Sequence, residues 1–446
     1  MADLKTNKME TKAMLPLIVS MALPPLCSMF MQFAYNFIDC IFVSWISEDA
    51  LTAVSLSFPL TTLMLAFSIG VGVGINVLIA RYLGQHDQDG ADNIVTHGLI
   101  VSAVFGMILT VIVFAALKPY FAMFIDDERI LDLAMQYMKI CIFLQVPNMV
   151  HIAIQKIIQG TGNMLAPMGF QMAGVVLNFV LDPLLIFGVG PFPEMGIRGA
   201  AVSTVLGYTF SMVLAFWVLI FTKQKVKIKT KGFKFDWSIV PQIFSIGLPS
   251  FIMNALGAFM VTFANAFLIV YSNTAVAFFG AYFKAQQLVV MTVNGLIQGC
   301  IPIMSYNYGA KKKDRLNQAF KYGTIIAVVM MGVGGILLSV FPAQILHIFR
   351  ASDEMIALGV PGLRIMATSY IFNGIATMVA SYMQSCRNLR WSIIINLLRQ
   401  LLVLIPMMWI LTRAIGMAGV WWAFPVAEVV TCIVCWVALK RVKIDI

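Results

Sequence analysis

The chain has 446 residues, of which 60% are hydrophobic and 11% charged, and its mean hydropathy is +0.89. A water-soluble fold cannot bury that much apolar surface, so the composition excludes a soluble protein and predicts an all-α protein whose helices cross a lipid bilayer. The net charge of +10 does not indicate a nucleic-acid partner, because the basic residues gather in the loops between apolar segments.

Twelve apolar segments are long enough, at about 20 residues or more, to form membrane-spanning helices. The first lacks a small-residue cleavage site, so we interpret it as a retained helix and not as a signal peptide. Most of the 30 Lys and Arg lie on the side of the N-terminal tail, which predicts that both termini are cytoplasmic. The predicted spans cover residues 14–45, 51–80, 94–118, 132–158, 165–190, 196–222, 238–272, 274–305, 318–346, 355–385, 392–412 and 416–439.

Several short patterns are interpreted as structural. GVGVG at 70–74 lies inside an apolar span with no strand before it, so we expect it to permit close helix packing and not to bind a nucleotide. Cys432 and Cys435 form a CxxC pair without further ligands, and the four His are scattered, so no cofactor is expected. No Walker motif or catalytic constellation occurs, so we predict neither an ATP-driven pump nor an enzyme.

The sequence contains an internal repeat. PLIVSMALP at 16–24 and PQIFSIGLP at 241–249 share five of nine positions at an offset of 225. Near the end of each half the offset becomes 220, where GIRGAA at 196–201 matches GMAGVW at 416–421. The change fits a small insertion in the preceding loop of the first half.

The repeat predicts two bundles of six helices. We expect an N-terminal lobe over 1–222, a basic cytoplasmic linker over 223–237 that can also contact membrane lipids, and a C-terminal lobe over 238–446. Because six is even, both lobes start on the same side of the membrane, which makes the repeat parallel. Such duplicated chains are typically transporters, with a cavity between the lobes and alternating access by rocking.

An ordered set of motifs resembles the multidrug and toxic compound extrusion (MATE) family over nearly the whole chain. The motifs are a Leu-Pro in the first span of each half, NFIDCIFVSWIS, IARYLGQHD, IIQGTGNMLAPM, LNFVLDPLLIFG, GIRGAA and IPIMSYNYGAKKKDR. The resemblance implies twelve helices in two lobes, a V-shaped central cleft, and export of small amphipathic, often cationic compounds driven by inward H⁺ or Na⁺. It also implies a monomer in the bacterial cytoplasmic (inner) membrane.

Three carboxylates lie well inside predicted spans: Asp39, Asp182 and Glu428. An acid at that depth costs about 2.5 to 3.5 kcal/mol on insertion scales, so each is a functional candidate. The alternative for each is an interhelical salt bridge or hydrogen bond that only locks packing. Asn178 is spaced i, i+4 from Asp182, so both project from one helix face.

Gln32, Asn36 and Asp39 are likewise predicted to share one face of the first helix, and Asn36 is a further candidate for the cation-coupling site. Two carboxylates that face each other in apolar surroundings repel when both are charged, so the pair formed by Asp39 and Asp182 can hold a proton or bind Na⁺.

The family resemblance extends this cation-coupling site residue by residue. In the branch that couples through the N-terminal lobe, the matching positions are Asp39, Asn178, Asp182 and Thr204, and a bound Na⁺ would lie at the first three. Their repeat partners in the second half include Val403 and Met407, which offer no cation ligand. The coupling site is therefore predicted in the first lobe alone.

Prolines inside spans are hinge candidates. Pro183 follows Asp182 and leaves the carbonyl of Phe179 without its helical partner. Pro24 and Pro25 weaken the first helix in the same way. The alternative is that membrane helices simply tolerate proline.

The substrate cleft is predicted to include Gln32, Tyr35, Lys284 and Glu428. Glu428 could attract a cationic substrate, or it could pair with Arg399 or Lys284, and the sequence leaves both possibilities open. Lys139 and Arg364 occupy equivalent repeat positions, which indicates matching roles near helix ends.

Two alternatives to drug efflux follow from the same sequence. A flippase for a lipid-linked precursor would need a cationic cleft for a pyrophosphate, and the four bases within spans, Lys139, Lys284, Arg364 and Arg399, keep it open. A non-transporting receptor or channel is the other alternative, which the duplication with paired hinges disfavours.

Overall fold

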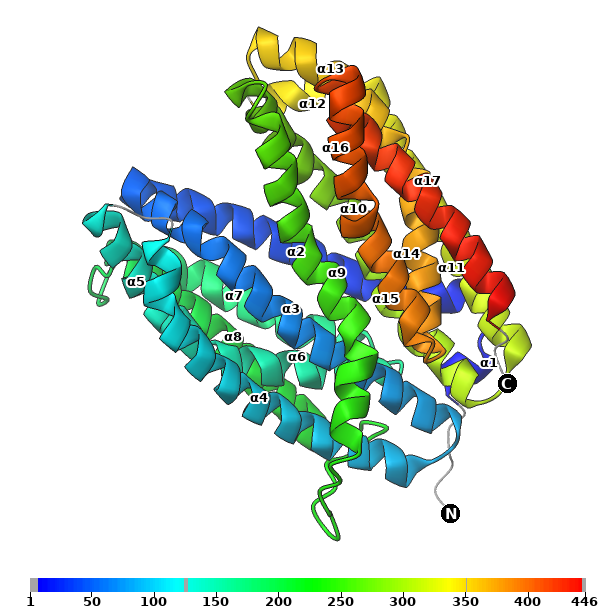
Figure 1. Cartoon of the computed structure of the whole chain (residues 1–446). Coiled ribbons are helices and arrows are strands. Elements are labelled where there is room, and N and C mark those ends of the chain that lie inside the picture. Colours follow the sequence, from blue (N-terminus) through cyan, green and yellow to red (C-terminus); the bar gives the residue numbers. More distant parts are fainter. Residues whose placement is uncertain (1–6, 124–126, 350, 443–446) are drawn as a thin grey trace. The chain divides into compact units, whose positions relative to one another are not determined.

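The computed structural model describes residues 7–123, 127–349 and 351–442, and all regular structure among them is helical (Figure 1). The helices of the first half are α1 (Lys8–Thr11), α2 (Met14–Ile46), α3 (Glu48–Gly84), α4 (Gln88–Ala122), α5 (Glu128–Phe143), α6 (Gln145–Gly160), α7 (Leu165–Phe187) and α8 (Ile197–Phe221). The second half contains α9 (Ile239–Leu268), α10 (Asn273–Gly309), α11 (Lys313–Val340), α12 (Pro342–Ile348), α13 (Asp353–Ala367), α14 (Tyr370–Ser385), α15 (Leu389–Leu397), the π-helical turn η1 (Leu398–Leu402), α16 (Leu404–Ile415) and α17 (Ala418–Arg441).

The predicted all-α membrane fold is confirmed. Among the described residues, ten helices, with α15, η1 and α16 counted as one, are long and apolar enough to cross a membrane, and two bent helix pairs bring the number to twelve if each pair is one span. These pairs, α5 with α6 and α13 with α14, form the fourth and tenth predicted spans, and each bends by 44°. Pro147 accounts for the first bend, because it has no N–H to donate to the carbonyl of Phe143 one turn earlier. At the second bend, the hydroxyls of Thr368 and Ser369 donate to preceding carbonyls instead.

Equivalent positions of the repeat begin helices in the same way. The Ser47 hydroxyl accepts the Ala50 N–H at 3.0 Å, and its repeat partner Ser272 accepts the Ala275 N–H at 3.1 Å. Asp127 and Ser352, also 225 residues apart, cap α5 and α13. The scaffold is thus repeated down to the caps of its helices.

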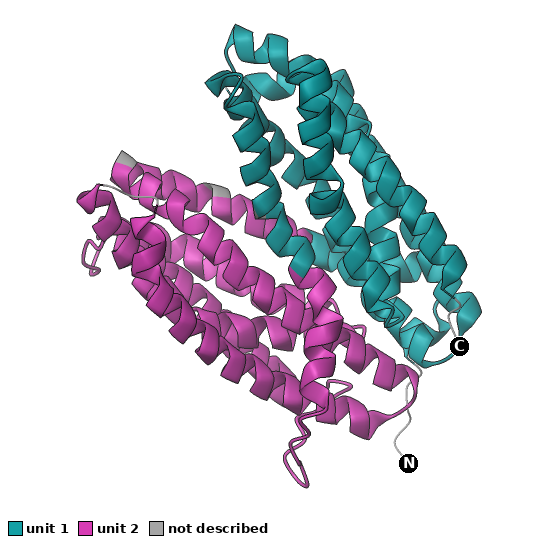
Figure 2. Ribbon diagram, viewed as in Figure 1, with its two compact units in different colours: residues 1–26, 252–446 teal, residues 27–251 magenta. Residues whose placement is uncertain are grey.

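The described chain forms two compact units (Figure 2). Unit 1 comprises residues 1–26 and 252–446, and unit 2 comprises 27–251. These units differ from the lobes expected from the sequence, because the starts of α2 and α9 each pack with the other half. The division of the chain into functional lobes at 223–237 stays a prediction.

Glycines explain why the start of each of these helices packs as it does. A Cβ added at Gly74 would lie 2.1 Å from the Ile243 carbonyl oxygen, so α9 touches α3 backbone to backbone in unit 2. At the equivalent Gly299 of α10, a Cβ would lie 2.8 Å from the backbone nitrogen of Ala22 in unit 1. Gly74 is the last residue of GVGVG, so the interpretation of this stretch as a close packing site is confirmed.

Candidate functional site

Asp182 is the centre of a buried polar cluster in unit 2. It lies on α7 with none of its surface exposed, and its carboxylate accepts a hydrogen bond from the Ser203 hydroxyl of α8. The side-chain amide of Asn178 forms hydrogen bonds with all of its polar neighbours when its nitrogen faces Asp182. In this orientation the nitrogen donates to the two carboxylate oxygens at 3.1 and 3.0 Å. An acid buried at this depth is therefore fully supplied with hydrogen-bond donors.

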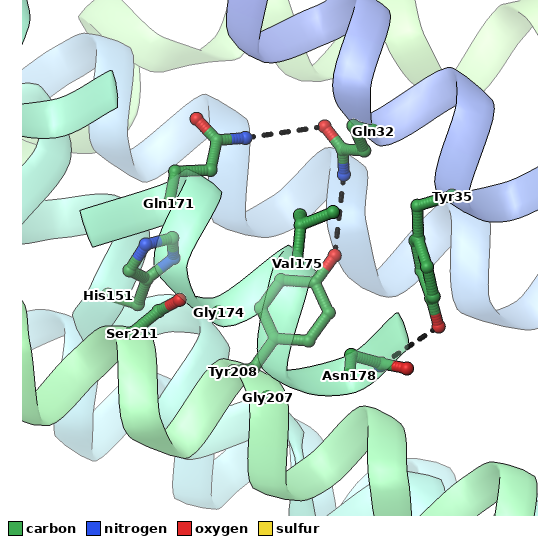
Figure 3. A pocket seen from close by; sticks show the side chains of 10 residues that line it. All are labelled: Gln32, Tyr35, His151, Gln171, Gly174, Val175, Asn178, Gly207, Tyr208 and Ser211. Carbon is green, nitrogen blue, oxygen red and sulfur yellow. Dashed lines mark hydrogen bonds between the residues drawn. The ribbon is translucent and has the colours of Figure 1, made fainter. Parts of the chain in front are cut away.

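Asn178 connects this carboxylate to α2 and α8. In the same orientation, its amide oxygen accepts hydrogen bonds from the Tyr35 hydroxyl at 3.0 Å and from the Thr204 backbone N–H at 3.3 Å. The hydroxyls of Tyr35 and Thr204 are also 3.2 Å apart. Figure 3 shows Tyr35 and Asn178 pointing toward each other. Three helices are thereby tied together around one acid.

Two glycines bring α7 and α8 close enough for these contacts. A Cβ at Gly174 would lie 2.6 Å from the Gly207 carbonyl oxygen, and one at Gly207 would lie 2.9 Å from the Gly174 oxygen. The two backbones therefore touch, which places Asn178 and Asp182 against Ser203 and its neighbour without intervening side chains.

Asp39 on α2 is the second acid of the site. Its carboxylate interacts electrostatically with that of Asp182. One of its oxygens, Oδ1, is buried and has no hydrogen-bond partner among the described residues. A buried carboxylate oxygen without a donor is costly, so it suits an added proton or cation.

A small cavity adjoins the cluster. Its volume is about 20 Å³, which is enough for one water molecule. Tyr35 and Asn178 are part of its wall. A chain of polar contacts crosses it (Figure 3): Gln171 donates to Gln32 at 3.5 Å, and Gln32 donates to the Tyr208 hydroxyl at 3.3 Å. We call this cavity the first pocket. The acid cluster is therefore adjacent to a small cavity whose wall carries hydrogen-bonding side chains.

A family model for MatE matches residues 24–184 and again 249–410. The two matches begin 225 positions apart, which is the offset of the internal repeat. Together they cover more than half of the chain. The chain belongs to the MatE family. This confirms the resemblance that its motifs indicate and the parallel repeat that underlies it.

Relatives of this MatE protein match along almost its full length. It is 24% identical over 429 residues to a protein of Shewanella oneidensis named FAD transporter, covering 95% of this chain and 94% of that one. It is 25% identical over 434 residues to the multidrug export protein MepA of Staphylococcus haemolyticus, covering 96% and 94%. A solved structure described as an outward-facing multidrug resistance MATE family transporter superposes with a TM-score of 0.91 at 25% identity, covering 98% and 97%. The MatE protein is thus a multi-pass membrane transporter and not an enzyme.

The structure places most of the predicted coupling residues of this MatE transporter in one cluster. Asn178 contacts both Asp182 and the Thr204 backbone, and Asp39 is close enough for its charge to interact with that of Asp182. Asn36 is exposed and lies outside the described hydrogen bonds of the cluster. Tyr35, expected only in the substrate cleft, is the residue of α2 that contacts Asn178.

Sequence reasoning missed Ser203. The signal was weak, because Ser203 and Thr204 are adjacent hydroxyl residues and nothing in the sequence says which of them faces Asp182. The structure uses both: the Ser203 side chain contacts the acid, and the Thr204 backbone contacts Asn178.

Glu428 of the MatE transporter lies in unit 1 and pairs with Arg399. The Arg399 guanidinium is 3.2 Å from its Oε1 atom, and the Asn373 amide donates to the same atom at 2.9 Å. Of the two pairings expected from the sequence, the one with Arg399 is therefore present, while Lys284 is exposed. Lys139 and Arg364 are exposed as well, and Arg364 donates to the Ser339 carbonyl at 3.3 Å.

The proline candidates lie inside continuous helices. Pro183 lies within α7, while Pro24 and Pro25 lie within α2 directly before the boundary between the units at 26 and 27. In the second half, Pro249 of α9 precedes the boundary at 251 and 252. Both helices that contribute to two units thus carry proline at the same repeat position, where the helix is easiest to bend.

Proposed function

We propose that this transporter is a secondary-active multidrug efflux antiporter that exports small amphipathic, often cationic compounds in exchange for H⁺ or Na⁺. The observation that carries the proposal is the buried network of Asp182, Asn178, Tyr35 and Ser203 beside the unpartnered oxygen of Asp39. Two acids and an amide supply the oxygen ligands that Na⁺ uses, and the acids alone suffice for a proton.

In this proposal the coupling ion neutralises the pair of acids. Without the ion, two carboxylates repel each other across apolar surroundings. Binding of H⁺ or Na⁺ removes that repulsion and lets α2 and α7 approach, and Pro183, Pro24 and Pro25 are the points at which these helices bend. Tyr35 belongs to this network and also lines the first pocket, as Gln32 does, so loading of the ion site changes the hydrogen bonds at the wall of that cavity.

The relatives support drug export, because one of them is named a multidrug export protein. Another relative is named FAD transporter, which makes FAD a second substrate to test. The flippase alternative has less support, since Arg399 is neutralised by Glu428 and the other three bases within the predicted spans are exposed. We place the transporter in the bacterial cytoplasmic membrane as a monomer. Its basic loops predict that both termini are cytoplasmic.

Reconstituted efflux tests the coupling site. We expect Asp182→Asn to reduce efflux of ethidium from proteoliposomes to the level of empty liposomes, under a pH gradient and under a Na⁺ gradient. The reason is that the neutral amide cannot bind the coupling H⁺ or Na⁺ as the carboxylate does. Asp39→Asn should have the same effect. Asp314→Asn, at an exposed position of α11, is the matched control and should transport like the parent. Parental, gradient-driven efflux by both site variants would refute the coupling site.

A further inference from the structure

The basic linker at 223–237 is bound along the beginning of α4 in unit 2 (Figure 1, the loop at the foot of α9). Val226 of the linker is completely buried, while most of its lysines are exposed. Three alternate residues of the linker bond to polar side chains of α4. The Gln88 amide donates to the Lys225 carbonyl at 2.7 Å, the Lys227 N–H donates to Asp92 at 2.8 Å, and the Lys229 N–H donates to the Thr96 hydroxyl at 2.8 Å.

His97 of α4 holds the end of the linker. Its side chain is completely buried, and its Nδ1 atom lies 2.9 Å from the Asn93 carbonyl oxygen. The backbone N–H of Asp236 donates to its Nε2 atom at 2.8 Å. A carbonyl can only accept and a backbone N–H can only donate, so the ring carries its hydrogen on Nδ1 and none on Nε2. These two contacts therefore require a neutral imidazole.

The residue that His97 holds also begins α9. The Asp236 carboxylate accepts the Ser238 N–H at 2.8 Å, and the Asp236 carbonyl accepts the Ile239 N–H at 3.2 Å, so Asp236 caps the helix. On either side of the contact, the rings of Phe233 and Phe235 pack on the imidazole with centroids 4.9 Å away. The start of α9, a helix that contributes to both units, is thereby attached to α4 through one histidine.

A proton on His97 is incompatible with this attachment. Histidine is the side chain whose charge ordinarily changes between pH 5 and 8. A hydrogen on Nε2 would point at the Asp236 N–H, so two donors would face each other, and a charge would be buried between two aromatic rings. Detachment of the linker relieves both costs, because the charged ring then reaches water. Protonation of His97 and release of the linker are therefore coupled.

The charged groups around His97 leave its proton affinity to the linker. The Asp236 carboxylate is exposed and interacts electrostatically with the ring, which favours the protonated form. On α4, Asp89 pairs with Lys229 at 2.6 Å, and Asp92 is engaged by the Lys227 N–H.

The helices packed against α4 present their titratable groups elsewhere. From α3, Ile75 lies against Gly98, the neighbour of His97, and Tyr82 lies against Gly90, about two turns earlier. On α6, Lys156 donates to Gln159, and His151 packs on Phe170 and Tyr208. α5 shares a core cluster with Leu117 and Phe121 at the other end of α4.

The start of α2 in unit 1 is anchored by different chemistry. The Glu10 carboxylate accepts hydrogen bonds from Lys312 at 2.8 Å and from the Tyr306 hydroxyl at 3.0 Å. Arg315 donates to the carbonyls of Met9 and Lys12 at 3.1 and 2.7 Å. None of the side chains in these contacts is a histidine. This anchor precedes the other helix that contributes to both units, so it is an internal reference for the linker.

From these contacts we propose that the linker is a proton-operated latch. It holds the start of α9 to α4 while His97 is neutral, and protonation of His97 detaches it. The linker is predicted to be cytoplasmic, so acidification of the cytoplasm is the signal that would release it. The inference does not depend on the efflux function or on the coupling acids.

Limited digestion of the full chain by trypsin in lipid nanodiscs tests the latch. The bond after Lys234 lies between the two phenylalanines that cover His97, and the bond after the exposed Lys12 lies in the anchor without histidine. The ratio of the two cleavage rates cancels the effect of pH on trypsin itself. We expect this ratio to rise about tenfold in the parent between pH 8 and pH 6, since loss of one hydrogen bond is worth about that factor.

Two variants separate the hydrogen bond from the packing. His97→Gln retains an acceptor that stays neutral, so its ratio should be the same at both pH values. His97→Phe keeps an aromatic ring between Phe233 and Phe235 but cannot accept the Asp236 N–H. Its ratio at pH 8 should equal that of the parent at pH 6. His347→Gln, at an exposed histidine of α12, is the matched control and should behave like the parent.

Three results would each overturn the latch. They are a parental ratio that is equal at pH 6 and pH 8, a rise in His97→Gln as large as in the parent, and protection of His97→Phe at pH 8 equal to that of the parent. Thermal melting checks the folding of each variant, and the parent with either folded variant decides the question. Failure of gradient-driven efflux would overturn the antiport proposal and leave this result unaffected.

Discussion

Two pockets of the molecule occupy equivalent places in the repeat but differ in size and chemistry. The first is about 20 Å³ and lies beside two acids, one of which is saturated with hydrogen bonds. The second pocket lies in unit 1, is about 210 Å³, and contains a buried ion pair. The helix caps, the packing glycines Gly74 and Gly299, and the prolines Pro24 and Pro249 repeat between the halves, so much of the scaffold is shared and the side chains in the pockets distinguish the halves.

One pair of positions explains much of this difference. A Cβ at Gly174 would lie 1.8 Å from the Ser211 Oγ atom and 2.6 Å from the backbone carbonyl oxygen of Gly207, so no larger residue fits between α7 and α8. Its repeat partner at the offset of 225 is Arg399, which lies in η1 and lines the second pocket. The close approach of α7 and α8 shrinks the first pocket, whereas a long side chain is accommodated in the second.

Breaking the ion pair of the second pocket should give the largest change in the free energy of unfolding. We expect Arg399→Met to reduce the free energy of unfolding by about 3 to 5 kcal/mol, because it leaves Glu428 buried without its partner. The double variant, Arg399→Met with Glu428→Leu, should recover most of the lost free energy of unfolding. Thermal melting in detergent measures both effects. Lys284→Met, at an exposed base of the same unit, is the control, and an equal melting temperature for Arg399→Met and this control would contradict the prediction.

A smaller effect is expected from filling the close contact of the first pocket. Gly174→Ala should reduce the free energy of unfolding by about 1 to 3 kcal/mol, because its new methyl group overlaps Ser211 and pushes α8 away from α7. It should also weaken coupling, since Asn178 and Ser203 would no longer meet at Asp182. Gly169→Ala lies on the same helix with nothing within 4 Å of the added methyl and should be neutral or slightly stabilising. Equal melting of the two variants would show that α7 and α8 are not in close contact.

Much of the fold could be predicted from the sequence. Hydropathy predicts the twelve spans, and the repeated motifs predict two related halves, because bilayer thickness and duplication leave direct traces in sequence. The i, i+4 spacing of Asn178 and Asp182 also predicts their contact, since it lies within one helix.

Contacts between helices could not be predicted in the same way. Asn36 was expected beside Asp39, yet Tyr35 is the residue that reaches Asn178, because packing and not spacing sets how a helix is rotated toward its neighbours. The π-helical turn at Arg399 likewise depends on tertiary packing and carries no distinctive residue pattern.

The smallest expected effect tests whether the scaffold is as symmetric as the pockets are different. Ser47→Ala and Ser272→Ala each remove the cap of a long helix, so each should reduce the free energy of unfolding by about 1 kcal/mol. The two losses should be equal, because each serine accepts the N–H of the residue three positions later, at 3.0 and 3.1 Å. Ser55→Ala, an exposed serine inside α3 whose hydroxyl donates to the Leu51 carbonyl, controls for the loss of a hydroxyl and should change melting little. A loss confined to one of the two caps would mean that the halves differ in their scaffold as well as in their pockets, and the side chains alone could then no longer account for the difference between the pockets.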